Sequence, residues 1–341
     1  MRSTIRAADA GLRESRPMTT EISRRALLLA GAASALPAFA QPLYPTRPIK
    51  LVVPYPPGGT ADAIARALAD RLKEQMGQPV IVENKAGASG TIGIDAVAKA
   101  APDGYTLAFS AISPLVLSPA LGKVPYDPDT DLMPVVSVMY SPVLLLATPA
   151  SSARDFRDLM GGAKDKPKSV RWSTSGNGSL GHLMLEQMQQ QSKVQFVHVP
   201  YKGGGQQLTD ALSGQFELLS INAGPTLTEH IKTGRLRPLA VGAPKRLDSL
   251  PTVPTLAELG YPKANLSSQF GVFAPARLPE RLLDRIHGEL VTAMQHPEVR
   301  NRMIASDNVP TGGSTKEFAK EIAAESLANA QIIKSVGIKA D

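Results

Sequence analysis

The chain has 341 residues, too many for one compact hydrophobic core, so we expect two lobes. Hydrophobic residues make up 43% and charged residues 20%, which is typical of a globular protein and excludes a disordered one. The net charge is +7, but no Lys/Arg block or basic–aromatic pattern accompanies it, so we expect no nucleic acid partner.

Residues 1–40 are predicted to be an export signal. Arg24-Arg25 precede an apolar run over 26–36, which is shorter than the roughly 20 residues of a membrane-spanning helix. Ala38-Phe39-Ala40 forms a small-x-small cleavage site. The paired arginines favour twin-arginine export, with Sec export as the alternative. We therefore expect a soluble periplasmic protein, cleaved after Ala40.

Cysteine is absent from the chain. An exported protein could have used disulfides, and a lipid-anchored one would need a cysteine at its new N-terminus. Neither is possible here, and thiolate metal sites and cysteine nucleophiles are excluded as well.

The stretch 50–77 has the strongest local signals. It predicts a buried strand over 51–53, a Pro/Gly loop over 54–59 and a helix that begins at Thr60, with Thr60 as its cap. Apolar residues recur every four positions from Ile64 to Met76, as on one face of a helix.

A strand that leads through a glycine loop to a helix N-terminus is typical of an anion site, because N–H groups and the helix dipole favour a carboxylate or phosphate. Gly58 and Gly59 allow a ligand to approach the backbone closely. Asp62 would oppose an anion, so we expect it to brace the loop; receiving a ligand amine or hydroxyl is its alternative role. A plain strand–helix corner is the alternative to an anion site.

The following segments repeat this arrangement. A strand over 80–82 leads through the loop 83–91 into a helix, and a strand over 105–109 ends at Ser110. This alternation is typical of an open, mostly parallel sheet with helices on both faces. Ligands bind such sheets beyond the carboxyl ends of the strands, where residues 57–60, 88–91 and Ser110 are expected.

Two apolar segments between 135 and 148 are separated by Ser141-Pro142, where we expect the first crossing between lobes. A strand over 169–173, the loop 175–181 and a helix then open the second lobe. A strand over 194–199 leads into a second glycine loop, in which Lys202 either pairs with a ligand carboxylate or is solvated.

A helix over 208–212 and a strand over 216–221 complete the second lobe. Thr255 with Glu258, and Ser314 with Glu317, have the spacing of helix capping boxes. The chain returns through 270–274, and two helices are expected to close it.

Two patterns in the second lobe could indicate a cofactor site or catalysis. Residues 176–181 match the dinucleotide pattern G-x-G-x-x-G, but the end of the next strand lacks the acidic residue that holds the ribose, so a second anion loop is favoured. Ser179 and His182 could form a hydrolytic pair, yet no G-x-S-x-G elbow or orienting acid accompanies them. The histidines show no metal-site spacing, and His198 is expected to be a packed or hydrogen-bonded core residue.

Seven sequence motifs follow one another along the chain: YPTRPIKLVVPYPPGGTADAIAR, GQPVIVENKAGASGTIG, AAPDGYTLAF, SLGHL, HVPYKGGG, LPTVPTLAELG and FGVFAPARLP. With these the chain resembles the tripartite tricarboxylate transporter substrate-binding proteins, or Bug receptors, from Tyr44 almost to the C-terminus. The resemblance implies a type II-like, two-lobed periplasmic binding protein that closes on a small carboxylate. It also implies a membrane permease as partner, or a sensor protein.

Two departures from the family pattern are visible. Ala88-Ser89-Gly90 stands where the family often has more glycine, which would alter ligand size or polarity. Phe270-Gly271 stands where Trp-Gly is frequent, so one aromatic wall or packing element is expected to be smaller.

These observations predict an α/β fold with a first lobe of residues 41–145 plus 270–341 and a second lobe of 146–269. The expected protein is a monomeric, non-enzymatic receptor for a di- or tricarboxylate, an amino acid or an aromatic acid, without cofactor or metal ion. The alternative is a periplasmic hydrolase that uses Ser179 and His182. The candidate ligand-binding residues are Tyr55, Pro57, Gly58, Gly59, Thr60, Asp62, Ala88, Ser89, Gly90, Ser110, Ser175, Asn177, Ser179, His182, Tyr201 and Lys202.

Overall fold

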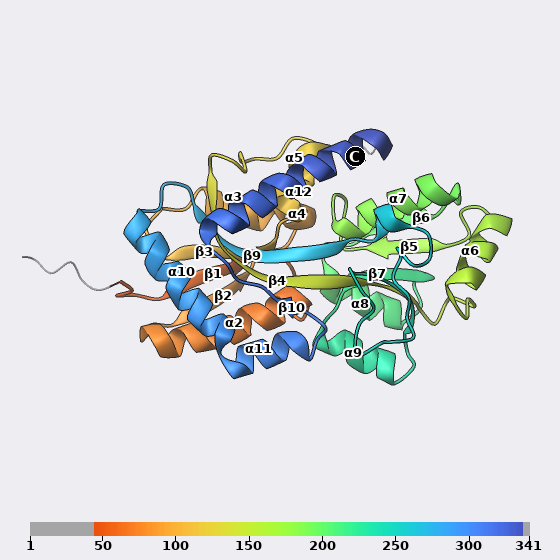
Figure 1. The fold of residues 1–341 in the computed structure, drawn as a ribbon, viewed down its shortest axis with the longest axis horizontal. Coiled ribbons are helices and arrows are strands. Elements are labelled where there is room, and N and C mark those ends of the chain that lie inside the picture. The colour runs from red at the N-terminus through yellow and green to blue at the C-terminus, as the bar shows by residue number, and fades with distance from the viewer. Residues whose placement is uncertain (1–43, 337–341) are drawn as a thin grey trace, which may run out of the picture. The chain divides into compact units, whose positions relative to one another are not determined.

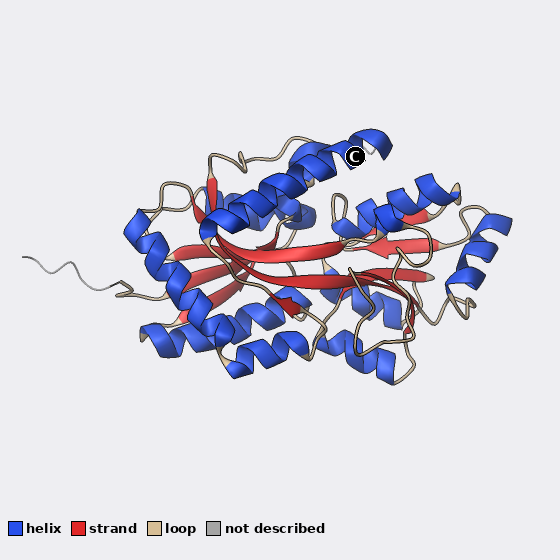
Figure 2. Ribbon diagram, in the orientation of Figure 1, coloured by secondary structure: helices blue, strands red, loops and turns tan. Residues whose placement is uncertain are grey.

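The computed structural model describes residues 44–336, which form an α/β fold around a mixed sheet (Figures 1 and 2). The expected export signal and its cleavage site lie outside the described residues. Each lobe contains three parallel strands, in the orders β2-β1-β3 and β7-β5-β6. Their bounds are Ile49–Val53 (β1), Val80–Asn84 (β2), Thr106–Ala111 (β3), Arg171–Thr174 (β5), Val197–Pro200 (β6) and Leu218–Asn222 (β7).

Two long strands, β4 (Leu132–Ala147) and β9 (Ser267–Pro275), run side by side through both lobes, antiparallel to each other (Figure 1). β9 also pairs antiparallel with β3, and β4 with β7, β8 (Arg237–Gly242) and β10 (Val309–Pro310). The parallel strands therefore carry the glycine loops as expected, while the connecting strands make the sheet as a whole mixed.

The two apolar segments on either side of Ser141-Pro142 form one strand, because β4 is continuous across this point. Its pairing with β9 ends at Pro142, and its pairing with β7 and β8 begins at Val143. A proline has no N–H to donate, and here it stands where the strand changes partners. The predicted lobe boundaries near this point stay a prediction.

Helices cover both faces of the sheet (Figure 1). In the first lobe, α2, α10 and α11 lie on one face and α3, α4, α5 and α12 on the other. Their bounds are Thr60–Met76 (α2), Thr91–Ala98 (α3), Ser113–Val116 (α4), Ser118–Leu121 (α5), Glu280–Gln295 (α10), Pro297–Ile304 (α11) and Thr315–Val336 (α12). The second lobe has Phe156–Asp165 (α6), Leu180–Ser192 (α7), Gly204–Leu212 (α8) and Pro225–Lys232 (α9), and the 3₁₀ turns are Ala88–Gly90 (η1) and Pro262–Ala264 (η2).

Three helices, not the expected two, follow β9 in the described residues. His296 is extended (φ −62°, ψ 131°) and Pro297 begins α11, so the segment is divided into α10 and α11. A residue before proline avoids helical angles, which accounts for the division. The Ser314–Glu317 capping box is present at the start of α12, whereas the Thr255–Glu258 box closes a turn and no helix follows it.

Helix α2 begins and ends largely as its sequence predicts. Ile64, Leu68 and Leu72 are buried against the sheet, and Gly77 ends the helix in the left-handed conformation (φ 68°). The cap residue is Gly59, however, and the predicted cap Thr60 directs its hydroxyl elsewhere.

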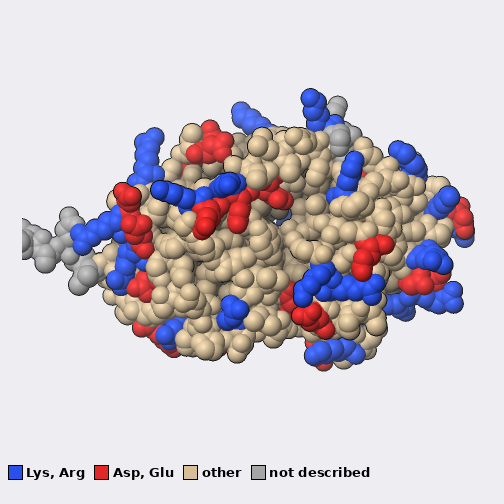
Figure 3. Space-filling model, viewed as in Figure 1, with Lys and Arg blue, Asp and Glu red and all other residues tan. Residues whose placement is uncertain are grey.

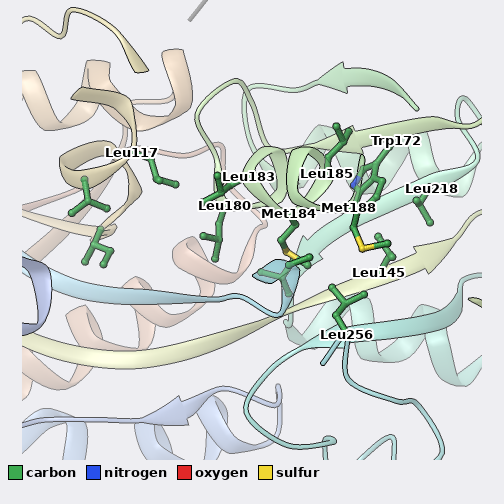
Figure 4. Packing of buried hydrophobic residues seen from close by; sticks show 14 of the residues in the cluster. Leu117, Leu145, Trp172, Leu180, Leu183, Met184, Leu185, Met188, Leu218 and Leu256 are labelled. Atoms are coloured by element: carbon green, nitrogen blue, oxygen red, sulfur yellow. The ribbon is translucent and has the colours of Figure 1, made fainter. Parts of the chain in front are cut away.

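One hydrophobic cluster extends across both lobes on the face covered by α3, α4, α7 and α12. It joins Ile94 and Val116 of the first lobe to Trp172 and Met188 of the second. Figure 4 shows Met188 of α7 pointing toward the sheet, with Trp172, Leu145 and Leu218 around it. On the opposite face each lobe has its own cluster, under α2 with α10 and under α8 with α9.

Candidate functional site

A cleft lies between the loops that follow the parallel strands of the two lobes. In the first lobe it is lined by residues after β1, together with Ser89, Ala111 and Ser113. In the second lobe the starts of α7, α8 and α9 line it, and Val143, Ser268 and Phe270 of the connecting strands complete it. The lining residues are Tyr55, Pro56, Gly58, Gly59, Thr60, Ala61, Ser89, Ala111, Ser113, Val143, Ser175, Ser179, Leu180, Gly181, Gly204, Leu208, Ser220, Ile221, Asn222, Gly224, Pro225, Thr226, Leu227, Ser268 and Phe270.

Four of the described helices begin at this cleft: α2 from the first lobe, and α7, α8 and α9 from the second. The first N–H groups of a helix have no partner within it. Among the described residues, nothing accepts a hydrogen bond from the N–H groups of 59–61, 180–181 or 226–227. Each helix start also carries a partial positive charge of about half an elementary charge. The cleft therefore presents amide donors from two opposite walls.

No Lys, Arg, His, Asp or Glu is among the residues that line the cleft. On the face of the molecule in Figure 3, basic and acidic side chains are interspersed and form no large block of one sign. An anion in the cleft would thus be stabilised by neutral backbone amides and hydroxyl groups, not by a charged side chain.

Asp62 braces the loop that precedes α2, as expected. Its carboxylate accepts hydrogen bonds from the Gly58 N–H (3.0 Å), from Arg66 Nε and Nη2 (3.0 and 2.8 Å) and from Asn84 Nδ2 (3.0 Å). Burial alone would raise the pKa of Asp62, but the hydrogen bonds from Arg66, Gly58 and Asn84 outweigh it and the pKa is lowered. One loop amide is therefore used by the protein, while those of 59–61 remain available.

Tyr55 forms an aromatic wall of the cleft. Its hydroxyl lies 3.4 Å from Ser110 Oγ, and its ring packs edge-on against Phe270, with centroids 6.4 Å apart. Burial raises the pKa of Tyr55 to about 12, so its hydroxyl is neutral at physiological pH.

Direct contacts join the two walls of the cleft. Thr60 Oγ1 donates to the Ala223 carbonyl (2.7 Å), and Ser89 Oγ donates to the Asn177 carbonyl. A Cβ on Gly224 would lie only 2.5 Å from Thr60 Oγ1, so a larger residue there would push the walls apart. The structure is therefore a closed arrangement of the two lobes.

Seven of the candidate residues line the cleft and nine do not. Those that line it are Tyr55, Gly58, Gly59, Thr60, Ser89, Ser175 and Ser179. Those that do not are Pro57, Asp62, Ala88, Gly90, Ser110, Asn177, His182, Tyr201 and Lys202.

Several of these nine have visible roles next to the cleft. Ser110 lies beneath Tyr55, and Tyr201 donates from its hydroxyl to Asp210 Oδ2 (2.7 Å). Lys202 is exposed. His182 accepts from the Gly178 N–H at Nδ1 (3.2 Å) and stacks on His198, whose Nε2 lies 2.7 Å from Thr174 Oγ1.

The hypothetical Ser179–His182 pair does not have the geometry of a catalytic dyad. Ser179 Oγ accepts from the backbone N–H of His182 and acts as the cap of α7. The two ring nitrogens of His182 face Gly178 and Glu186, at 3.2 and 3.7 Å, so neither is directed at the serine hydroxyl.

Sequence reasoning pointed to Phe270, which lines the cleft, but missed the start of α9 and Ser268 of the floor. The α9 signal was present, because Asn222-Ala223-Gly224-Pro225 places glycine and then proline after a strand, as at many helix starts. Ser268 has no such signal, since it occupies an ordinary strand position. Within residues 44–336 no cluster of metal-ligating side chains occurs, and no helix there is long and apolar enough to cross a membrane.

Comparisons with known proteins give a consistent result. The model of the tripartite tricarboxylate transporter family receptor matches residues 64–338. The protein BugT of Bordetella pertussis is 36% identical over 324 residues, which is 94% of this chain and 99% of BugT.

Solved structures share the fold. A Rhodopseudomonas palustris protein solved with adipate is 32% identical, with a TM-score of 0.82 over 87% of this chain and 99% of that one. MatC of the same organism, solved with bound malate, is 26% identical, with a TM-score of 0.80 over 85% of this chain and 100% of MatC.

Proposed function

The chain belongs to the tripartite tricarboxylate transporter receptor family, and from that premise we propose that it captures a small dicarboxylate between its lobes without transforming it. Proteins of this family are solute-binding receptors of the periplasm, not enzymes.

The observation that carries the proposal is a cleft without charged side chains in which helix N-termini face one another. One carboxylate would accept from the amides of 59–61 at the start of α2. A second carboxylate would accept from the starts of α7 and α9, with Ser179 Oγ beside them. Closure removes water from the cleft and strengthens each of these hydrogen bonds.

The solved relatives support a ligand with two carboxylates, because adipate and malate each carry one at either end. An aromatic or monocarboxylic acid would leave one set of amides buried without an acceptor, which costs free energy.

The remaining parts of the proposal concern the setting of the receptor. We infer export by the signal in residues 1–40, cleavage after Ala40 and a monomeric receptor that delivers its solute to a tripartite permease or reports it to a sensor protein. The lobes would comprise residues 41–145 with 270–341, and 146–269.

A thermal-shift screen of the purified protein tests the binding function. Dicarboxylates of four to six carbons should raise the melting temperature, and the matching diamides, which have the same shape without charge, should not. Equal shifts by acids and diamides would contradict recognition by anion-directed amides. Conversion of the bound solute, lost in Ser179→Ala, would instead favour the hydrolase.

A further inference from the structure

The floor of the cleft is made by the two strands that connect the lobes. Val143 of β4 and Ser268 and Phe270 of β9 line it. Residues two apart on a strand face the same side, so Ser141 faces the same side as Val143. Ser141 and Ser268 are paired across the two strands, so their side chains are neighbours on one face, and Ser268 is the one of the two that lines the cleft.

Within residues 44–336, neither hydroxyl has a hydrogen-bond partner. Ser268 is only 5% exposed and lines the cleft, yet no described residue makes a hydrogen bond with its Oγ. Ser141 is fully buried, and its Oγ also lacks a partner among the described residues. Buried hydroxyl groups are normally hydrogen-bonded, so this floor is arranged for a polar group that enters the cleft.

The surroundings of Ser268 limit what that group can be. An anionic partner would favour a ligand ammonium, and no acidic side chain lines the cleft. The buried carboxylate of Asp62, behind the first wall, already accepts from Gly58, Arg66 and Asn84. A neutral ligand hydroxyl, which both donates and accepts, matches a serine hydroxyl without any charge to compensate.

We propose that Ser268 is a specificity-determining residue that reads a hydroxyl substituent between the two ends of the ligand. The receptor then selects hydroxydicarboxylates over their unsubstituted and amino-substituted counterparts. This inference rests on the proposed function, because the amides of the two walls must hold the two carboxylates on either side of the floor.

Calorimetric titration of the purified full chain with matched acids tests the inference. The probes are three series that differ only at carbon 2: succinate, malate and aspartate; glutarate, 2-hydroxyglutarate and glutamate; adipate, 2-hydroxyadipate and 2-aminoadipate. In the series whose carbon number gives the tightest binding, the hydroxy acid should bind about 5- to 10-fold more tightly than the unsubstituted acid, the ratio that one net hydrogen bond provides. The amino acid should bind most weakly.

Two variants test whether the preference for the hydroxy acid comes from the Ser268 hydroxyl. Ser268→Ala should bind the hydroxy acid and the unsubstituted acid equally. Ser113→Ala removes another serine hydroxyl of the cleft, on the first wall, and should keep the preference.

Equal affinities in the parent protein, a tighter-binding amino acid, or a preference that persists in Ser268→Ala would each overturn the inference. So would the failure of all nine acids to bind. If a wider carboxylate screen then still finds a ligand, the proposed receptor function stands and only the hydroxyl selectivity is lost. If that screen finds no ligand, the receptor function and the hydroxyl selectivity are both overturned. If Ser268→Ala does not fold, the comparison of the three series in the parent protein decides alone.

Discussion

Replacing Asp62 by asparagine tests whether a single carboxylate holds the first anion loop in shape. The change keeps the size of the side chain but removes its charge and one acceptor oxygen. In the parent, four hydrogen bonds converge on this carboxylate, one from the Gly58 amide, two from Arg66 and one from Asn84. In the variant, the new amide NH₂ must face at least one of these donors.

The magnitude follows from which of those bonds are lost. Breaking a buried ion pair costs about 3–5 kcal/mol, but Arg66 is half exposed and can turn into water, which lowers the cost. We expect the free energy of unfolding to fall by roughly 2–3 kcal/mol at pH 7, measured by urea denaturation. Ligand affinity should fall about tenfold, because a mobile Gly58 leaves the neighbouring amides less well oriented.

The pH dependence gives an independent check. The pKa of Asp62 is lowered in the folded protein, so its contribution is present above the unfolded value of about 3.9 and is lost as the pH falls through the folded pKa. The difference between parent and Asp62→Asn should therefore shrink in acid.

A matched control comes from an exposed pair of the same kind. Asp158 accepts from Arg154 four residues earlier on the surface, so Asp158→Asn should change neither stability nor affinity appreciably. The bracing role would be refuted if the two substitutions lowered the free energy of unfolding equally. It would also be refuted if the loss in Asp62→Asn stayed constant down to low pH.

Three further predictions concern the cleft and its surroundings. Gly59→Val should abolish dicarboxylate binding in calorimetry, because the new side chain would block the approach of a ligand to the backbone amides. The melting temperature should change little, because Gly59 has φ −83° and its Cβ would approach no atom closer than 4.0 Å. Retained affinity would contradict the anion site. Thr60→Val removes the hydrogen bond to Ala223 and should weaken binding roughly 3- to 10-fold without a large loss of stability; unchanged affinity would mean that this contact does not favour closure. Burial and the neighbouring His182 lower the pKa of His198 to about 4, so protons bind the unfolded chain first and stability falls from about pH 6.5 to 4. His198→Phe should lose less stability over that range in urea denaturation, and an identical pH profile would show that His198 is not the group responsible.

The first strand–loop–helix unit could be predicted well because its signals are local. The apolar period of α2, the glycine that ends it and the bracing role of Asp62 all depend on residues within one short segment. Thr60 was misassigned as the cap because its true partner, Ala223, is 163 residues away in sequence.

The floor and second wall were harder to predict for the same reason. Pro142 resembles a strand end when read alone, and only the change of partners from β9 to β7 and β8 explains its place inside β4. Ser268 has no distinctive neighbours in sequence, and its importance appears only when the two connecting strands lie at the bottom of the cleft. Conversely, Lys202 was prominent in its glycine loop but is directed into solvent.

The two connecting strands, β4 and β9, also determine how a solute would leave. Points near the axis of a rotation move least, and the strands shared by both lobes lie where any such rotation must be centred (Figure 1). When the walls separate, the solute would first lose its hydrogen bonds to the amides of one wall and keep its contact with the floor. Departure would then have two stages, and the dwell time in the half-open molecule would depend on the strands that hold the halves together.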